Sequence, residues 1–172
     1  MISRAHALAP DAAIIVAGCY AQGAPEEVFA LPGVAALAGT AERANIVELA
    51  ENALAGIRRT DVRAYRGREV FEELDVSREG RTRAYLKIQD GCDRYCAYCI
   101  IPYVRGPVRS RSLGDVRRQL EALEREGYRE IVLTGIHLMS YGKDLVGETL
   151  LDAISQADGL PGIRRIRLGS LE

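Results

Sequence analysis

Short apolar runs, each ending near a glycine, alternate in the first third of the chain with stretches of helical periodicity. Residues 12–17 form such a run before Gly18, which is typical of a buried parallel strand leading into a loop. Residues 33–39 predict a second small strand, and a proline at the first position of 25–29 favours a short helix there. An amphipathic helix ending at Gly56 is predicted from apolar residues at helical spacing, which are Ile46, Leu49, Ala50, Ala53 and Leu54.

The same alternation returns with longer elements in the second half of the chain. Strands are predicted over 85–90, 130–134 and 163–168. One helix, ending at Gly127, separates the first two strands, and a second helix from about 148 to 157 separates the last two. The order βαβαβ predicts a parallel sheet with right-handed crossovers, whose functional loops lie together at the carboxyl ends of the strands.

The stretch 58–80 between these regions is rich in Arg and Glu with scattered apolar residues, and it predicts a linker. One exposed strand is expected within it, around 70–74. We therefore predict an α/β chain with two domains, residues 1–57 and 81–172. The first domain reads as the end of a βαβα layer, and the second as the beginning of a β/α barrel, because three strands cannot close one.

The distribution of charged residues along the chain says more about function than the overall composition does. The 172 residues are 48% hydrophobic, which is enough for a packed core and excludes a disordered chain. A net charge of -1 gives no global basic field of the kind that marks many nucleic-acid-binding proteins. A basic stretch near the middle is opposed only by Asp115, and its arginines suit either phosphate binding or a solvated helix face; they are Arg105, Arg109, Arg111, Arg117 and Arg118.

No apolar run approaches the length of a membrane span. Residues 12–17 are also too short for the core of a signal peptide, because Pro10 and Asp11 interrupt the apolar segment before them. We therefore expect a cytoplasmic protein, in which the cysteines stay reduced and available for metal.

Three of the four cysteines lie in a C-x3-C-x2-C array, Cys92, Cys96 and Cys99, directly after a predicted strand. Three thiolates on one loop suit an iron-sulfur cluster, and a cubane of four irons would be left one ligand short. A zinc site would need a fourth protein donor, yet the only histidines are His6 and His137. A disulfide framework would leave one of the three cysteines unpaired.

With an aromatic residue at Tyr98, this array resembles the signature of radical S-adenosylmethionine (SAM) enzymes. Further segments resemble the methylthiotransferase family within that group: Gly18-Cys19-Tyr20-Ala21-Gln22, Leu86-Lys87-Ile88-Gln89-Asp90-Gly91-Cys92, Cys99-Ile100-Ile101-Pro102, Arg105-Gly106-Pro107 and Arg109-Ser110-Arg111. The resemblance runs from about residue 12 to the end of the chain. It implies an N-terminal domain with an auxiliary iron-sulfur cluster, a radical SAM barrel, and an RNA-binding domain that this chain lacks.

The resemblance also implies roles for individual residues. Cys92, Cys96 and Cys99 would hold a [4Fe-4S] cluster whose fourth iron binds SAM, and Cys19 matches the last of three ligands to the auxiliary cluster, its partners lying upstream. No further catalytic residue is assigned. Cofactor-binding residues would be Tyr98, Gly135, His137, Ser140 and Tyr141, and tRNA phosphates would be bound by Arg105, Arg109 and Arg111. For His137, a hydrogen-bonded structural role and a direct role at SAM both stay open.

The loop Leu133-Thr134-Gly135-Ile136-His137-Leu138, followed by Ser140-Tyr141-Gly142, looks most like the branch that adds a 2-methylthio group to N6-threonylcarbamoyladenosine beside the tRNA anticodon. The implied chemistry is hydrogen abstraction from the adenine by a radical derived from SAM, followed by sulfur insertion and methylation. Implied partners are tRNA, an electron donor and a sulfur donor. Alternatives are the branches acting on isopentenyladenosine or on a ribosomal-protein aspartate, another radical SAM enzyme, and a non-catalytic iron-sulfur or zinc-binding module. On this resemblance the chain is an internal piece of a longer enzyme.

Overall fold

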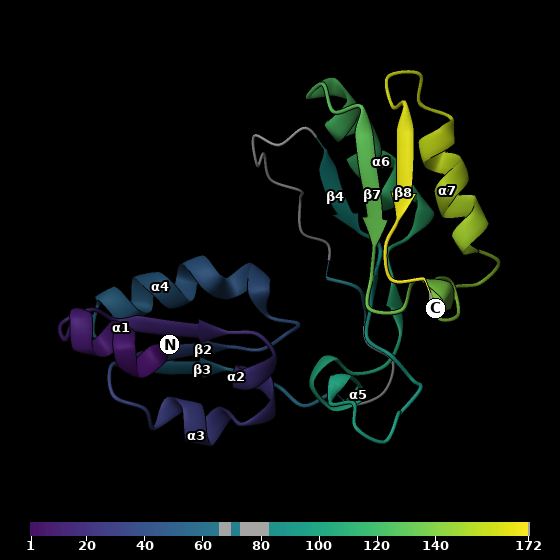
Figure 1. The fold of residues 1–172 in the computed structure, drawn as a ribbon. Helices are drawn as coiled ribbons and strands as arrows, with labels where there is room; N and C mark the ends of the chain where they lie inside the picture. Colours follow the sequence, from purple (N-terminus) through teal and green to yellow (C-terminus); the bar gives the residue numbers. More distant parts are fainter. Residues whose placement is uncertain (66–69, 73–82, 172) are drawn as a thin grey trace. The chain divides into compact units, whose positions relative to one another are not determined.

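A computed structural model describes residues 1–65, 70–72 and 83–171 of the protein. The chain divides into two compact units, Met1–Arg66 with Tyr103–Arg105 and Gly67–Pro102 with Gly106–Glu172. Each unit has a three-stranded parallel sheet with helices packed on it (Figure 1). The prediction of an α/β chain with parallel sheets is therefore confirmed.

The first unit is a sheet with helices on both faces. Its strands, in the spatial order β1-β2-β3, are Ile14–Ala17, Val34–Ala38 and Arg59–Asp61. The helix α4 (Ile46–Leu54) covers one face, and three short helices cover the other (Figure 1); these are α1 (Ile2–Leu8), α2 (Cys19–Gly23) and α3 (Pro25–Phe29). A short 3-10 helix, η1 (Arg43–Asn45), precedes α4. Because both faces are covered, the central strand β2 consists entirely of apolar residues.

Residues of β2 supply the two small cores of this unit, with an irregular register against β1 at its start. Ala36 and Ala38 pack against Leu49 of α4, and Val34 and Leu37 pack with Val28 of α3. The small alanine side chains on the first face let the helix approach the sheet closely.

Three elements of the first unit differ from the sequence-based expectation. The helix α1 was not predicted, since it has no buried residue and therefore no apolar stripe to reveal it. The helix α2 begins at Cys19, where a loop was expected. The strand β3 lies inside the range predicted as a linker; it consists of Arg59, Thr60 and Asp61 and joins β2 through backbone pairing alone, which no apolar pattern announces.

Most of the predicted linker falls outside the described residues, including 66–69 and 73–80. The strand expected around 70–74 is not formed at Val70–Glu72, and its remaining two residues lie outside the described part of the chain.

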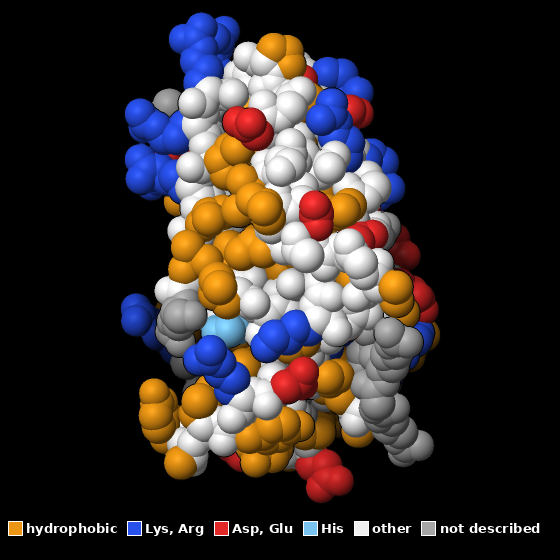
Figure 2. Space-filling view, turned by 90° about the vertical axis from the view of Figure 1, so that its right-hand side faces the viewer, with side chains coloured by type: hydrophobic (Ala, Val, Ile, Leu, Met, Phe, Trp, Pro, Cys, Tyr) orange, Lys and Arg blue, Asp and Glu red, His pale blue; other side chains and the backbone are white. Residues whose placement is uncertain are grey.

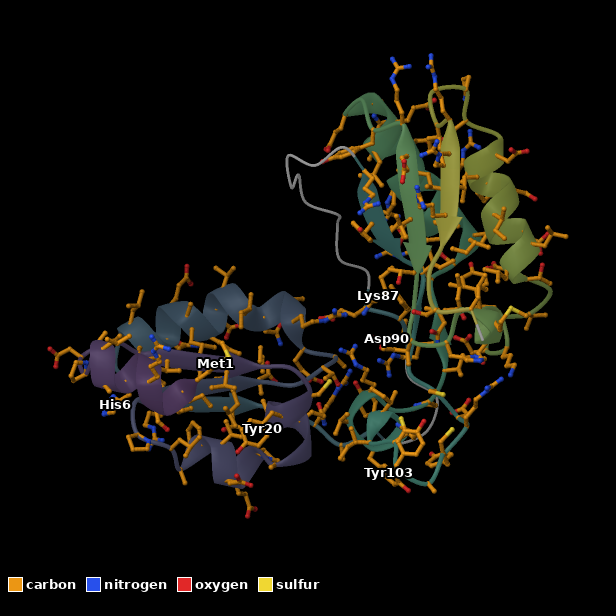
Figure 3. The ribbon with its side chains drawn as sticks, viewed as in Figure 1. Met1, His6, Tyr20, Lys87, Asp90 and Tyr103 are labelled. Carbon is orange, nitrogen blue, oxygen red and sulfur yellow. The ribbon has the colours of Figure 1, made fainter. Side chains whose placement is uncertain are left out.

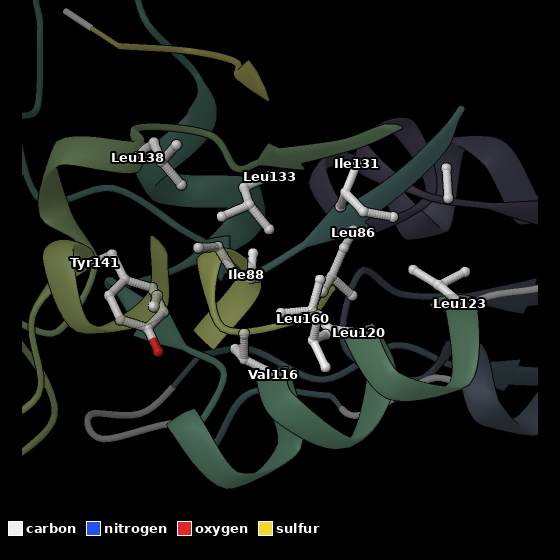
Figure 4. Close-up of a cluster of buried hydrophobic side chains, with 13 residues drawn as sticks. Leu86, Ile88, Val116, Leu120, Leu123, Ile131, Leu133, Leu138, Tyr141 and Leu160 are labelled. Carbon is white, nitrogen blue, oxygen red and sulfur yellow. The ribbon is translucent and has the colours of Figure 1, made fainter. Parts of the chain in front are cut away.

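The second unit is a sheet of spatial order β4-β7-β8, with strands Ala84–Lys87, Glu130–Thr134 and Arg165–Leu168. The helices α6 (Leu113–Arg125) and α7 (Leu150–Asp158) pack together on one face of it. Figure 4 shows the core between them, with strand side chains meeting helix side chains; the labelled residues are Leu86, Ile88, Val116, Leu120, Leu123, Ile131, Leu133, Leu138, Tyr141 and Leu160. Parallel pairing of the three strands confirms the predicted βαβαβ order.

Side-chain caps fix where the two long helices of this unit begin. The hydroxyl of Ser112 accepts a hydrogen bond from the backbone N–H of Asp115 at the start of α6. Thr149 and Asp152 form a reciprocal capping box at the start of α7. Each cap satisfies backbone donors that the first helical turn leaves unpaired.

The strand predicted over 85–90 is in fact two strands. The first, β4, pairs in parallel with β7, and this pairing extends as far as Lys87. After Ile88 the chain forms β5 (Gln89–Asp90), which pairs antiparallel with β6 (Arg109–Ser110). The cysteines, and the short helix α5 (Ile101–Arg105), therefore lie between two strands that are paired with each other.

The surface of the second unit is basic where its strands begin. Figure 2 shows Lys and Arg side chains at the upper end of the molecule, where β7 and β8 start in Figure 1. Glu130 at the start of β7 accepts a hydrogen bond from Arg167 Nε at 2.6 Å and one from Arg165 Nη1 at 3.2 Å, both on β8.

None of the helices in the described ranges is long and apolar enough to cross a bilayer.

Candidate functional site

The cysteine loop, residues 91–108, is closed at its neck by backbone pairing. Gln89 and Asp90 of β5 lie opposite Ser110 and Arg109 of β6, and just inside the loop Cys92 N–H donates to the carbonyl of Gly106 at 3.1 Å. Gly91 has a φ of 71°, and a Cβ at this position would overlap the carbonyl oxygen of Pro107. Only glycine therefore lets the two sides of the neck approach this closely.

The three cysteines of the loop are free thiols. Cys92 and Cys99 are half-buried, Cys96 is exposed, and Cys99 N–H donates to the carbonyl of Cys96 at 2.9 Å. Tyr98 is 96% exposed, and Tyr95 adopts a left-handed φ of 47°. Three reduced thiols on one accessible loop are the donor type that iron-sulfur clusters require. Within the described ranges, no three His, Cys, Asp or Glu side chains are already gathered to hold a metal ion.

A buried carboxylate stands at the entrance to this loop. Asp90 is 2% exposed; it pairs with Lys87 Nζ at 2.6 Å, accepts a hydrogen bond from Gly91 N–H at 2.9 Å, and lies 3.7 Å from Arg109 Nη2. Figure 3 shows Lys87 and Asp90 together where β4 passes into β5. The ring of Phe71 lies 5.5 Å from the Lys87 ammonium, covering that cation. The charges of this entrance are thus compensated inside the unit.

The amide of Gln89 joins the cysteine loop to the loop that follows β7. Its Oε1 accepts hydrogen bonds from the backbone N–H groups of Ile136 at 2.9 Å and His137 at 2.8 Å. Its Nε2 donates to the carbonyls of Asp90 and Gly91, both at 2.8 Å. Gln89 is fully buried, and all four of its hydrogen bonds are made within this unit.

The predicted cofactor-binding residues of the loop after β7 are held in its interior. His137 is buried, and its Nδ1 shares a hydrogen bond of 2.7 Å with the hydroxyl of Ser140. Tyr141 packs in the core of Figure 4, and its hydroxyl donates to the carbonyl of Arg111 at 2.6 Å. Burial raises the pKa of Tyr141, so the phenol stays protonated as a donor. In this arrangement Tyr141 supports the fold of the unit, and its ring is not open to a ligand.

Two of the three arginines predicted to contact phosphate are buried. Arg109 and Arg111 are 2% and 3% exposed, near the carboxylates of Asp90 and Asp115, respectively. In this structure their guanidinium groups neutralise internal acids and are not displayed on the surface, and their assignment as phosphate contacts stays a prediction. Arg105, at the end of α5, is half-buried.

Cys19 lies in the first unit, half-buried at the first position of α2 after the carboxyl end of β1. A polar cluster surrounds the ends of β1 and β2 there. Gln22 Oε1 accepts a hydrogen bond from Thr40 N–H at 3.1 Å, and Glu42 pairs with Arg63 at 2.7 Å. Burial raises the pKa of the Glu42 carboxyl, and the ion pair with Arg63 opposes part of that rise.

Comparison with known sequences agrees with this arrangement. A profile of the Radical SAM superfamily matches residues 86–168, from β4 to the end of β8. The chain is 40% identical to a threonylcarbamoyladenosine tRNA methylthiotransferase MtaB of Bacillus subtilis, with all of the chain and 39% of that protein aligned. Residues 86–168 thus match the Radical SAM superfamily, and the chain as a whole is similar to methylthiotransferases.

Other methylthiotransferases are similar to the chain at comparable identity. The MtaB protein of Thermotoga maritima is 40% identical over 94% of this chain and 36% of its own length. A ribosomal protein uS12 methylthiotransferase RimO of Desulforudis audaxviator is 38% identical over 90% of the chain and 35% of its own length. The chain thus spans under two fifths of these relatives. Radical SAM proteins in general use SAM and a [4Fe-4S] cluster.

Sequence reasoning missed the polar residues that hold the cysteine loop in place. Gln89 and Asp90 stood inside a recognised motif but received no role, and Ser110 and Asp144 were not singled out. Ser110 donates from its backbone N–H at 2.8 Å and its hydroxyl at 2.6 Å to the Asp144 carboxylate, and its hydroxyl accepts from Gly142 N–H at 2.9 Å. The available signal was alternation: Gln89 falls on the polar side of the predicted strand 85–90, yet only Asp90 separates it from the cysteine loop.

Proposed function

We propose that the chain is part of a radical SAM tRNA methylthiotransferase that adds a 2-methylthio group to N6-threonylcarbamoyladenosine beside the anticodon. The observation that carries the proposal is the closed cysteine loop, whose neck is tied by Gln89 to the loop 135–142. The cysteine loop carries the signature of radical SAM enzymes, and the loop after β7 is the segment whose sequence looks most like this branch of the family. The relatives named MtaB, at 33 to 40% identity, support the same substrate.

Cys92, Cys96 and Cys99 would hold the [4Fe-4S] cluster that binds SAM. When bound, the cluster and SAM together supply one-electron chemistry that generates an organic radical. The chain's own part is to hold the thiols on one loop and to neutralise the charges at its entrance through Asp90 and Lys87. Tyr98, fully on the surface, would stack against the adenosyl group.

The finer assignments follow from the same resemblance. Residues 1–57 would end an N-terminal methylthiotransferase domain whose auxiliary cluster is bound through Cys19, giving two clusters in the whole enzyme. Residues 58–80 would be a linker, and 81–172 would be the first βα units of a partial barrel. Gly135, His137 and Ser140 would lie near SAM, and Arg105 would contact tRNA phosphate. The enzyme would act in the cytoplasm with separate electron and sulfur donors.

Anaerobic reconstitution of this chain with iron and sulfide tests the cluster assignment. We expect an iron-sulfur absorption band and, after reduction, an electron paramagnetic resonance (EPR) signal that changes when SAM is added. Cys96→Ala is expected to lose both signals, whereas Cys19→Ala keeps the SAM-dependent change. A zinc-loaded protein that takes up no iron, or a cluster indifferent to SAM, would contradict the proposal.

The substrate is tested with the full-length enzyme that contains this chain. It is supplied with tRNA carrying threonylcarbamoyladenosine, tRNA carrying isopentenyladenosine, or ribosomal protein uS12, and the products are analysed by mass spectrometry. We expect a methylthio product only with the first substrate. A product on uS12 alone would move the enzyme to the branch of the RimO relative.

A further inference from the structure

The arrangement of Gln89 is unusual because one side chain satisfies two donors on one loop and two acceptors on another. Its Oε1 receives Ile136 N–H and His137 N–H, and its Nε2 gives hydrogen bonds to Asp90 and Gly91. The orientation of the amide is fixed by these partners, since exchanging its oxygen and nitrogen would set donors against donors and acceptors against acceptors.

Gly135 leaves the space that the Gln89 side chain occupies. A Cβ at position 135 would lie 2.7 Å from Gln89 Oε1 and 2.9 Å from Gln89 Cβ. The backbone after β7 can therefore reach the amide only if residue 135 has no side chain. Gln89 and Gly135 act as a matched pair, in which one residue supplies the polar contacts and the other leaves room for them.

We propose that Gln89 is a positioning residue that holds the neck of the cysteine loop at a fixed distance from the backbone of Ile136 and His137. This inference rests on the proposed function, because those two segments are where cluster and SAM would bind. Buried amides with four partners are costly to disrupt, so the spacing between the two loops is set before any cofactor is present.

Two variants of Gln89 separate the two sides of the contact. Gln89→Glu keeps an acceptor oxygen for the N–H groups of Ile136 and His137 but sets its second carboxylate oxygen against the carbonyls of Asp90 and Gly91. Gln89→Met keeps the length of the side chain and loses all four hydrogen bonds. Thr149→Ala is the matched control, because it removes the cap of α7 in the same unit and leaves all four side-chain hydrogen bonds of Gln89 in place.

Amide hydrogen exchange on the metal-free chain is the first measurement. We expect Gln89→Met to accelerate exchange at Ile136 and His137 by about tenfold or more, and Gln89→Glu and Thr149→Ala to leave both amides protected. The second measurement is the SAM-induced change of the EPR signal at equal iron content. Gln89→Met and Gln89→Glu are expected to reduce that change, because each releases the neck of the cysteine loop.

The inference would be overturned if exchange at the Ile136 and His137 amides were unchanged in Gln89→Met. It would also be overturned if the SAM-induced EPR change of Gln89→Met equalled that of Thr149→Ala. If Gln89→Met does not fold, Gly135→Ala displaces the same amide while keeping the glutamine, and the same two outcomes apply to it. Should the unaltered chain bind iron but ignore SAM while Gln89→Met still loses protection at Ile136 and His137, the proposed function fails and the loop contact stands.

Discussion

The guanidinium of Arg111 forms an ion pair with the carboxylate of Asp115, and the two side chains are 4% and 2% exposed. Arg118 binds the other oxygen of the same carboxylate, but its own side chain is 58% exposed. The ring of Phe71 lies 5.0 Å from the Arg111 guanidinium. One acid at the start of α6 is therefore shared between an interior arginine and a surface arginine.

Replacing these two arginines by methionine is expected to have unequal effects. Arg111→Met leaves a buried carboxylate with only a surface partner and is expected to lower the free energy of unfolding by about 3 to 5 kcal/mol. Arg118→Met removes a solvent-screened contact and is expected to cost less than about 1 kcal/mol. Urea unfolding of both variants checks this, and equal losses would mean that Arg111 is not an internal ion-pair residue.

Gly91→Ala is expected to open the neck of the cysteine loop. The new Cβ would overlap the Pro107 carbonyl at a φ that alanine rarely adopts, so the loss of stability is expected to exceed about 1 kcal/mol. Iron uptake during reconstitution is expected to fall with it. Gly114→Ala is the control, because nothing lies within 4 Å of a Cβ at that position in α6 and alanine favours a helix. A Gly91→Ala protein with normal stability and iron content would refute the steric argument.

Tyr141→Phe is expected to lower the free energy of unfolding by about 1 to 2 kcal/mol at neutral pH, since the carbonyl of Arg111 loses its donor. Burial raises the pKa of Tyr141, so the phenol ionises in the unfolded chain before it ionises in the folded one. Its contribution is therefore complete below the ordinary pKa of about 10 and declines as the pH rises above it. Unfolding curves at neutral and alkaline pH should show the two proteins converging; a constant difference would contradict this.

The contribution of Glu130 to stability is expected to depend on pH in the opposite direction. The hydrogen bond from Arg167, followed by the charges of Arg167 and Arg165, lowers the pKa of the Glu130 carboxyl below its usual 4.5. Its contribution is therefore present above pH 4.5 and lost as the pH falls through the lowered pKa. The difference in thermal stability between the unaltered chain and Glu130→Gln is expected to shrink on acidification and also with added salt. A difference that grew on acidification would show that these contacts do not favour the carboxylate.

Local sequence signals were enough to place two elements to the residue. The helix α3 and the strand β7 have the predicted bounds, Pro25–Phe29 and Glu130–Thr134. A proline marks the first position of the helix, and the strand forms around the apolar run 131–133. The strand β3 could not be predicted in this way, since Arg59, Thr60 and Asp61 join the sheet only through their backbone.

The candidate site could likewise be predicted only in part from the sequence. The cysteine spacing pointed to the loop, and the match of residues 86–168 to the Radical SAM superfamily supports that interpretation. The burial of Arg109 and Arg111 could not be foreseen, because a charged residue is expected at the surface unless a partner is known to be buried beside it. The contacts of Gln89 could not be foreseen either, because its hydrogen-bond partners Ile136 and His137 lie more than forty positions away in sequence.

The paired strands β5 and β6 have a further consequence for the assembly of the cysteine loop. A flexible chain loses entropy when its ends are brought together, and here Asp90 and Arg109 are already joined across the ribbon. The entropy of ring closure therefore belongs to the folding of the sheet, and an incoming cofactor has only to order the interior of a ring that already exists. Removing iron with a chelator would then empty the loop and leave the surrounding sheet intact. The loop could afterwards take up iron again without refolding of the sheet.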